Sequence, residues 1–145
     1  ISSLFFYTAH RIFHTPYLYK NFHKQHHRYV NTEALSAYDV GFFEFTFLYI
    51  PTGIIPFFSC YIMFQETCIN VWSSYIYSIF SILYSVYIHV PKPSKYDPLR
   101  LWPFSDFKNH HLHHKFNNCN YSSPANDLPD ILFGTLKKSK LKIDN

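Results

Sequence analysis

Two long apolar stretches occupy the middle of the chain. Residues 45–65 and residues 67–91 contain no Asp, Glu, Lys or Arg, and Glu66 separates them. Each stretch is close to the roughly 20 residues that a helix needs to cross the apolar core of a bilayer. Buried helices of a soluble protein are the alternative, but the rest of the chain has too few polar residues to cover them. We therefore predict two membrane helices, over residues 42–65 and 67–90, that form a hairpin.

The segments before the hairpin are predicted to be helices that become polar. Residues 1–13 form an apolar helical pattern that turns polar at His10, and Pro16 must end or kink that helix just after His14. Residues 17–29 then predict a basic, amphipathic helix at the membrane surface. Its cations are Lys20, Lys24 and Arg28.

The segments after the hairpin alternate between irregular and helical patterns. Residues 91–103 are rich in proline, and Trp102 and Phe104 are residues typical of anchors at a membrane interface. The remaining predictions are a helix over residues 104–116, a turn over 117–121, a short apolar helix over 128–136 and a frayed, charged tail over 137–145.

Composition adds little about function. A length of 145 residues fits one domain, and 21% of the residues are aromatic. The three cysteines have no paired spacing, which favours reduced thiols over a disulfide framework. The first residue is Ile1, inside an apolar run, so we interpret the chain as a fragment that lacks its N-terminal part.

A two-helix hairpin returns the chain to the side of the membrane from which it started. The segments before and after the hairpin are therefore expected to meet on one face. Lys and Arg concentrate there, within residues 11–28 and 92–142, and the positive-inside tendency makes that face cytosolic. Attraction to lipid head groups explains the net charge of +4, and no pattern indicates nucleic-acid binding.

The ten histidines all lie in these flanking segments or at the end of the second apolar stretch. Most are spaced i, i+3 or i, i+4, which places imidazoles on one face of a helix. Neutral imidazole binds zinc, copper, iron and nickel, and there are too many here for one tetrahedral ion. The sequence therefore predicts a two-metal site. The ligand groups are His10 and His14, then His23, His26 and His27, then His110, His113 and His114.

Two further residues lie near this predicted site in the sequence. His89 ends the second apolar stretch. A lone histidine there is more often an interfacial residue than a ligand, but its arrival on the same face as the others makes it a candidate ligand. Glu44 either orients a ligand imidazole or caps the cytosolic end of the first membrane helix, and both interpretations stay open.

The histidine pattern resembles the three histidine boxes of the fatty acid hydroxylase and sterol desaturase superfamily, which are membrane di-iron oxygenases. The boxes here read HRIFH from His10, HKQHH from His23 and HHLHH from His110, in the family's order and at similar separations. The second box is similar to that of 4-methylsterol oxidases, and the sequence that follows the third box is similar to the cholesterol 25-hydroxylase type. Other matching positions are Tyr19, Lys20, Ala37, Tyr38, Glu44, the FNNCNY segment over 116–121, Gly134 and Thr135.

The chain departs from the family pattern at three places. Asn109 stands where many members carry the first histidine of the last box. His111 occupies a spacer position often held by Asp, so we do not expect it to be a ligand. Val90 and the residues after it replace the Asp- and Asn-rich surroundings that usually accompany the histidine at position 89.

The resemblance implies an all-α integral membrane enzyme with a cytosolic, histidine-rich helical cap that holds two ferrous ions. One fatty acid hydroxylase-type domain would cover residues 1–145, with boxes within 1–14, 17–29 and 104–116. Dioxygen would be the oxidant, with electrons from NADPH or NADH through cytochrome b5 or a reductase. A sterol or fatty acyl lipid of the endoplasmic reticulum would be hydroxylated, oxidised at a methyl group or desaturated. The implied ligands are His10, His14, His23, His26, His27, His89, His110, His113 and His114.

A zinc-dependent membrane hydrolase and a non-enzymatic metal-binding membrane protein are the alternatives. Zinc hydrolases usually place a carboxylate base beside their histidines, as in H-E-x-x-H, and none of the three boxes contains Asp or Glu. A metal carrier needs ionisable groups along the ion path inside its membrane helices. Residues 45–65 and 67–88 contain no charged or histidine side chain, so the oxygenase is favoured.

Overall fold

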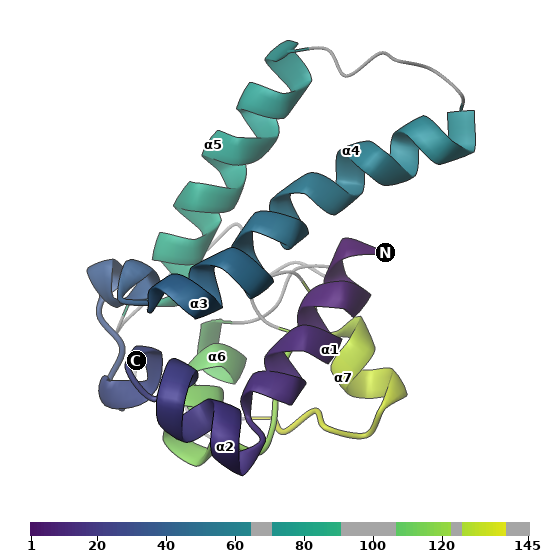
Figure 1. Cartoon of the computed structure of the whole chain (residues 1–145). Coiled ribbons are helices and arrows are strands. Elements are labelled where there is room, and N and C mark those ends of the chain that lie inside the picture. The colour runs from purple at the N-terminus through teal and green to yellow at the C-terminus, as the bar shows by residue number, and fades with distance from the viewer. Residues whose placement is uncertain (65–70, 91–106, 123–125, 139–145) are drawn as a thin grey trace, which may run out of the picture.

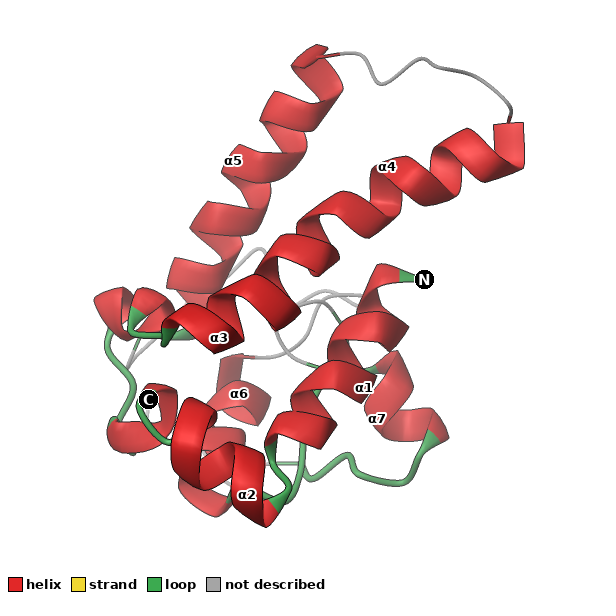
Figure 2. Ribbon diagram, in the orientation of Figure 1, coloured by secondary structure: helices red, strands yellow, loops and turns green. Residues whose placement is uncertain are grey.

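The computed structural model describes residues 1–64, 71–90, 107–122 and 126–138. Two long helices, α4 and α5, project from a base that contains α1, α2, α6 and α7 (Figure 1). Every regular element in the described part of the chain is a helix, so the predicted all-α class is confirmed there (Figure 2). The bounds are α1 Ser2–Phe13, α2 Pro16–Leu18, η1 Tyr19–His23, η2 His26–Arg28, η3 Ala34–Tyr38, α3 Phe42–Glu44, η4 Phe45–Tyr49, α4 Ile50–Phe64, α5 Val71–Ile88, α6 Phe107–Phe116 and α7 Leu128–Leu132.

α1 ends at Phe13, close to the break predicted from Pro16. Thr15 is extended, with ψ of 148°, because the ring of Pro16 disfavours helical geometry in the residue before it. Pro16 then begins α2, where its missing N–H leaves no hydrogen bond unmade. The chain turns at this point and brings the first two histidines of α1 against those that follow.

Residues 17–29 are helical but do not form the single α-helix that the sequence predicts. η1 is a π-helical turn, in which the Lys24 N–H donates to the Tyr19 carbonyl at 2.8 Å. η2 is a tighter 3-10 turn, in which the Arg28 N–H donates to the Gln25 carbonyl at 3.2 Å. Single π-helical turns inside longer helices are frequent at functional sites, because they change the direction of the side chains that follow.

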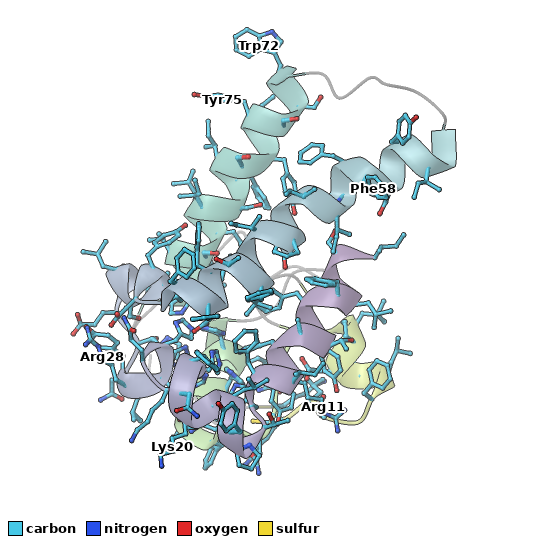
Figure 3. The ribbon with its side chains drawn as sticks, in the orientation of Figure 1. Arg11, Lys20, Arg28, Phe58, Trp72 and Tyr75 are labelled. Carbon is cyan, nitrogen blue, oxygen red and sulfur yellow. The ribbon has the colours of Figure 1, made fainter. Side chains whose placement is uncertain are left out.

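The two projecting helices occupy the region predicted to form a membrane hairpin, but in the described part of the chain only one of the two predicted membrane helices has the length and hydropathy of a span. Residues 42–64 are continuously helical through α3, η4 and α4, and α5 adds 18 residues. One helix in the described part of the chain is long and apolar enough to cross a membrane, with a window over Phe42–Ser59 of mean hydropathy 1.3, of which 11% is buried in the protein. Phe58, Trp72 and Tyr75 are exposed on the projecting helices (Figure 3).

Three cations of the described residues lie at the opposite end of the molecule from these aromatic side chains. Figure 3 shows Arg11, Lys20 and Arg28 around the base, away from the far ends of α4 and α5. The predicted interfacial anchors, Trp102 and Phe104, fall outside the described residues, as does most of the predicted tail. The molecule therefore has one strongly apolar end and one basic end.

The interior of the base is mostly polar. Its apolar cluster is small, formed by Phe6, Phe13 and Leu48 with partly buried neighbours. Among the described residues, five of the eleven largest fully buried side chains are histidines, and Glu44 and Asp130 are among the rest. Burying so many polar groups is costly unless each finds a partner, so the polar interior marks the part of the molecule with a chemical role.

The segment after α6 reverses the chain twice. Asn117 and Asn120 have positive φ, 56° and 57°, which confirms the predicted turn. α7 ends at Leu132, earlier than the predicted 128–136 helix, because Gly134 adopts a left-handed conformation with φ of 67°. This reversal returns residues 135–137 along the turn that follows α6, as the hydrogen bond from the Asn120 N–H to the carbonyl of residue 135 shows.

Candidate metal centre

The structure brings all nine predicted ligand histidines together in two adjacent groups. Within each group, the candidate ligand atoms all lie within 4.8 Å of one another. His111 lies outside both groups, as predicted, with Nε2 at 2.8 Å from Thr32 Oγ1 and 3.1 Å from the Val90 carbonyl. Group one is His10, His14, His23, His27 and His113, and group two is His26, His89, His110 and His114.

The Nε2 atoms of group one are spaced like the ligands of one metal ion. His10 and His23 have their Nε2 atoms 3.1 Å apart, and His23 and His27 have theirs 3.0 Å apart. The His14 and His113 Nε2 atoms are also 3.1 Å apart. Two nitrogens at about 2.1 Å from one ion, at angles of about 90 to 110°, lie about 3.0 to 3.4 Å apart. The observed separations fall within or close to that range.

Group two has similar spacing. The Nε2 atoms of His89 and His110 are 2.8 Å apart, and those of His110 and His114 are 3.1 Å apart. His26 completes the group, with its ring centroid 4.7 Å from that of His114. The groups also touch, because the rings of His27 and His114 stack at 4.5 Å between centroids. The arrangement therefore suits two ions held close together.

Hydrogen bonds on the outer side of two rings leave their inner nitrogens suited to binding a cation. Nδ1 of His10 donates to the Tyr121 carbonyl and Nδ1 of His113 donates to the Cys119 carbonyl, each at 2.7 Å. A carbonyl only accepts, so in the neutral rings both Nε2 atoms carry a bare lone pair. These two lone pairs lie 3.2 Å apart and cannot hydrogen-bond to each other. A metal ion is the natural partner for both, so these residues fit one.

The histidines are also held in the protonation state that binds metal. Burial lowers the pKa of His26, His110 and His113 well below the usual 6.5, and repulsion from neighbouring imidazoles lowers it further. The rings are therefore neutral at pH 7, and little free energy is lost in displacing protons when metal binds.

Comparison with known proteins agrees with this geometry. The family model described as fatty acid hydroxylase matches residues 1–135. The chain belongs to the fatty acid hydroxylase family. No curated protein and no solved structure matched it. Membership of this family implies a metal-dependent enzyme that oxidises lipids in membranes.

The second and third histidine boxes are each divided between the two groups. His26 and His27 are adjacent in sequence, yet His27 belongs to group one and His26 to group two. On α6, His110 and His114 belong to group two, while His113 belongs to group one. Consecutive residues of a helix point about 100° apart, so a histidine box that lies between two ions can supply ligands to both.

Glu44 lies behind a histidine of the hydroxylase centre. Its Oε1 is 2.9 Å from Nδ1 of His23, and both side chains are fully buried. This proximity fits one of the two interpretations left open by the sequence, a carboxyl group that orients an imidazole. His89 is oriented in a comparable way, because its Nδ1 donates to the Ser85 carbonyl at 2.7 Å.

Sequence reasoning missed the polar residues that hold the turn after the third box. Asn120 and Asp130 are 1% and 0% exposed. The Asn120 side chain ties the turn to the carbonyls of Asn109 and Lys137, and the Asp130 carboxylate accepts hydrogen bonds from the turn. One feature of the sequence could have identified Asp130. It is a charged residue within a segment predicted to be an apolar helix, and a charged residue in such a pattern is seldom buried without a role.

Proposed function

We propose that this fatty acid hydroxylase is an iron-dependent oxidoreductase that uses dioxygen to attack a C–H bond of a membrane lipid, either a sterol or a fatty acyl chain. The observation that carries the proposal is the pair of bare, convergent Nε2 atoms of His10 and His113 inside a centre built from nine histidines. When bound, two ferrous ions supply the activation of dioxygen that such a reaction needs.

The protein groups have separate tasks in this proposal. The nine imidazoles, including His89, would hold the ions, while the hydrogen bonds behind rings such as His10 and His113 would fix the direction of their lone pairs. Burial of the rings keeps bulk water from the centre, which prevents loss of the oxidising equivalent to side reactions. Dioxygen gives one atom to the lipid and one to water in a hydroxylation, so two electrons and two protons must come from NAD(P)H through cytochrome b5 or a reductase.

The donor set favours an oxygenase over a zinc hydrolase. Both groups contain histidines alone among the described residues, with no carboxylate positioned to act as a general base. Glu44, the acidic residue found close to the centre, lies on the Nδ1 side of His23. A hydrolase would need a base on the side where Nε2 atoms converge.

The apolar exposed surface supports a location in a membrane. α4 and α5 expose Phe58, Ile62, Trp72 and Ile76 by more than half of their surface. An apolar patch of this extent is unfavourable in water. We propose that the hairpin enters the endoplasmic reticulum membrane, with the basic end and the metal centre on the cytosolic side.

Determining which metal the protein binds, and how many ions per chain, tests this function. The protein is purified anaerobically in mild detergent beside the double variant His113→Ala, His114→Ala and the control His111→Ala. We expect about two iron ions per chain in the wild type and the control, and few in the double variant. Labelled sterols or fatty acids should be oxidised only with NADPH and dioxygen. One zinc per chain, or no metal, would refute the oxygenase.

A further inference from the structure

The carboxylate of Asp130 is buried and devoted to one turn of the chain. It accepts hydrogen bonds from the Tyr121 N–H at 2.9 Å and the Ser122 N–H at 2.8 Å. The hydroxyls of Thr135, at 2.6 Å, and Ser122 donate to it as well. In the described part of the chain no Lys or Arg forms an ion pair with it. The charge is therefore stabilised by these four donors, most of which belong to the turn after the third histidine box.

That turn is also what orients a ligand of group one. The Ser122 N–H and the Tyr121 carbonyl belong to the same peptide group. On one side this peptide donates to Asp130, and on the other its carbonyl accepts the Nδ1–H of His10 at 2.7 Å. Hydrogen bonds aligned in series polarise one another, so the negative charge strengthens the bond to His10 and makes its Nε2 a better electron donor.

We infer that Asp130 is a positioning residue, which tunes and orients His10 through the peptide between Tyr121 and Ser122. This inference rests on the proposed two-ion centre. Carboxylates that orient metal-binding histidines usually contact the ring directly, whereas here one peptide group stands between them. Asp130 touches neither an ion nor a substrate, and it acts through His10.

The connection is selective for group one. The other ring fixed by this turn is His113, also of group one, whose Nδ1 donates to the Cys119 carbonyl. In group two, His89 donates to a carbonyl of α5, and no described hydrogen bond links that group to Asp130. Loss of the charge should therefore weaken one ion and leave the other.

The test compares Asp130→Asn with Glu33→Gln in the full chain. Asparagine keeps the size of Asp130 but removes its charge, whereas Glu33→Gln removes one carboxylate charge from an exposed residue that belongs to neither histidine group. Metal-free protein is titrated with Co²⁺, and its visible absorption bands report each ion. His27→Ala and His26→Ala assign the bands to group one and group two. For Asp130→Asn we expect about 10- to 100-fold weaker binding at group one, with shifted bands. Both ions of Glu33→Gln should bind within about twofold of wild type.

Equal weakening of both ions would overturn the inference, because a purely structural role affects the centre as a whole. Unchanged binding of both ions would overturn it as well. Melting of the metal-free proteins checks folding. If Asp130→Asn does not fold, Asp130→Glu, which keeps the charge but displaces it, should still weaken group one selectively, and equal weakening there would again refute the idea. Fewer than two ions in the wild type would instead contradict the proposed function.

Discussion

The outer nitrogen of each imidazole determines what its inner nitrogen can do. His10, His89 and His113 each donate through Nδ1 to a backbone carbonyl, which fixes the tautomer and leaves Nε2 free for an ion. Backbone carbonyls suit this task because neighbouring hydrogen bonds hold them in place. The centre is thus arranged in advance by backbone carbonyls, which no residue type in the sequence reveals.

Asn120 provides a residue-scale test of this framework. Its Nδ2 donates to the carbonyls of Asn109 and Lys137, each at 2.9 Å, and its Oδ1 accepts the Lys137 N–H at 2.7 Å. Asn120→Ala would leave these buried groups unpaired and place alanine at a φ of 57°. We expect a loss of about 2 to 5 kcal/mol in unfolding free energy, measured by denaturation in detergent.

Asn117 is the matched control for that variant. It has nearly the same positive φ, 56°, but its Nδ2 makes a single hydrogen bond, to the Tyr19 hydroxyl at 3.0 Å. Asn117→Ala should therefore cost about 1 to 2 kcal/mol. Equal losses in the two variants would show that backbone strain, and not the buried hydrogen bonds of Asn120, determines the stability of the turn.

Helix periodicity predicted which histidines gather but not how they divide. The i, i+3, i+4 spacing identified the ligands of the second and third boxes as neighbours on a helix. The division depends on where each helix lies relative to the two ions, which is set by packing between distant segments. The π-helical turn of η1 added a local change in direction that the amphipathic pattern of residues 17–29 did not reveal.

Adjacent histidines should therefore affect different ions. His27→Ala removes a member of group one, and His26→Ala removes a member of group two. We expect each variant to retain about one tightly bound ion while the other binds at least about tenfold more weakly, because each loses one ligand of a single ion. Cobalt spectra of the two variants should then be complementary. Identical spectra would mean that the two groups form one shared site.

At the scale of the molecule, composition and spacing predicted the helical class, the hairpin region and the convergence of the histidines. Charge-free stretches define helices locally, and the boxes carry their own pattern. The link from Asp130 to His10 could not be predicted, since it joins residues far apart through a backbone carbonyl. His111 shows the converse. It lies inside a histidine box but outside both groups, at the spacer position where the family resemblance predicted a residue that is not a ligand.

The metal centre should also hold the base together. Its ligands come from α1, η1, η2, α6 and the end of α5, whereas the apolar cluster of Phe6, Phe13 and Leu48 joins fewer segments. Removing the ions leaves buried lone pairs facing one another, as in His10 and His113. An ion present at 100 times its dissociation constant stabilises the folded state by about 2.7 kcal/mol, so two ions contribute about twice that. We expect chelation to lower the melting temperature in a metal-dependent way and to speed proteolysis in the turn after α6 more than in α4. A melting temperature unchanged by chelation, in protein shown to have lost its metal, would mean that packing alone maintains the base.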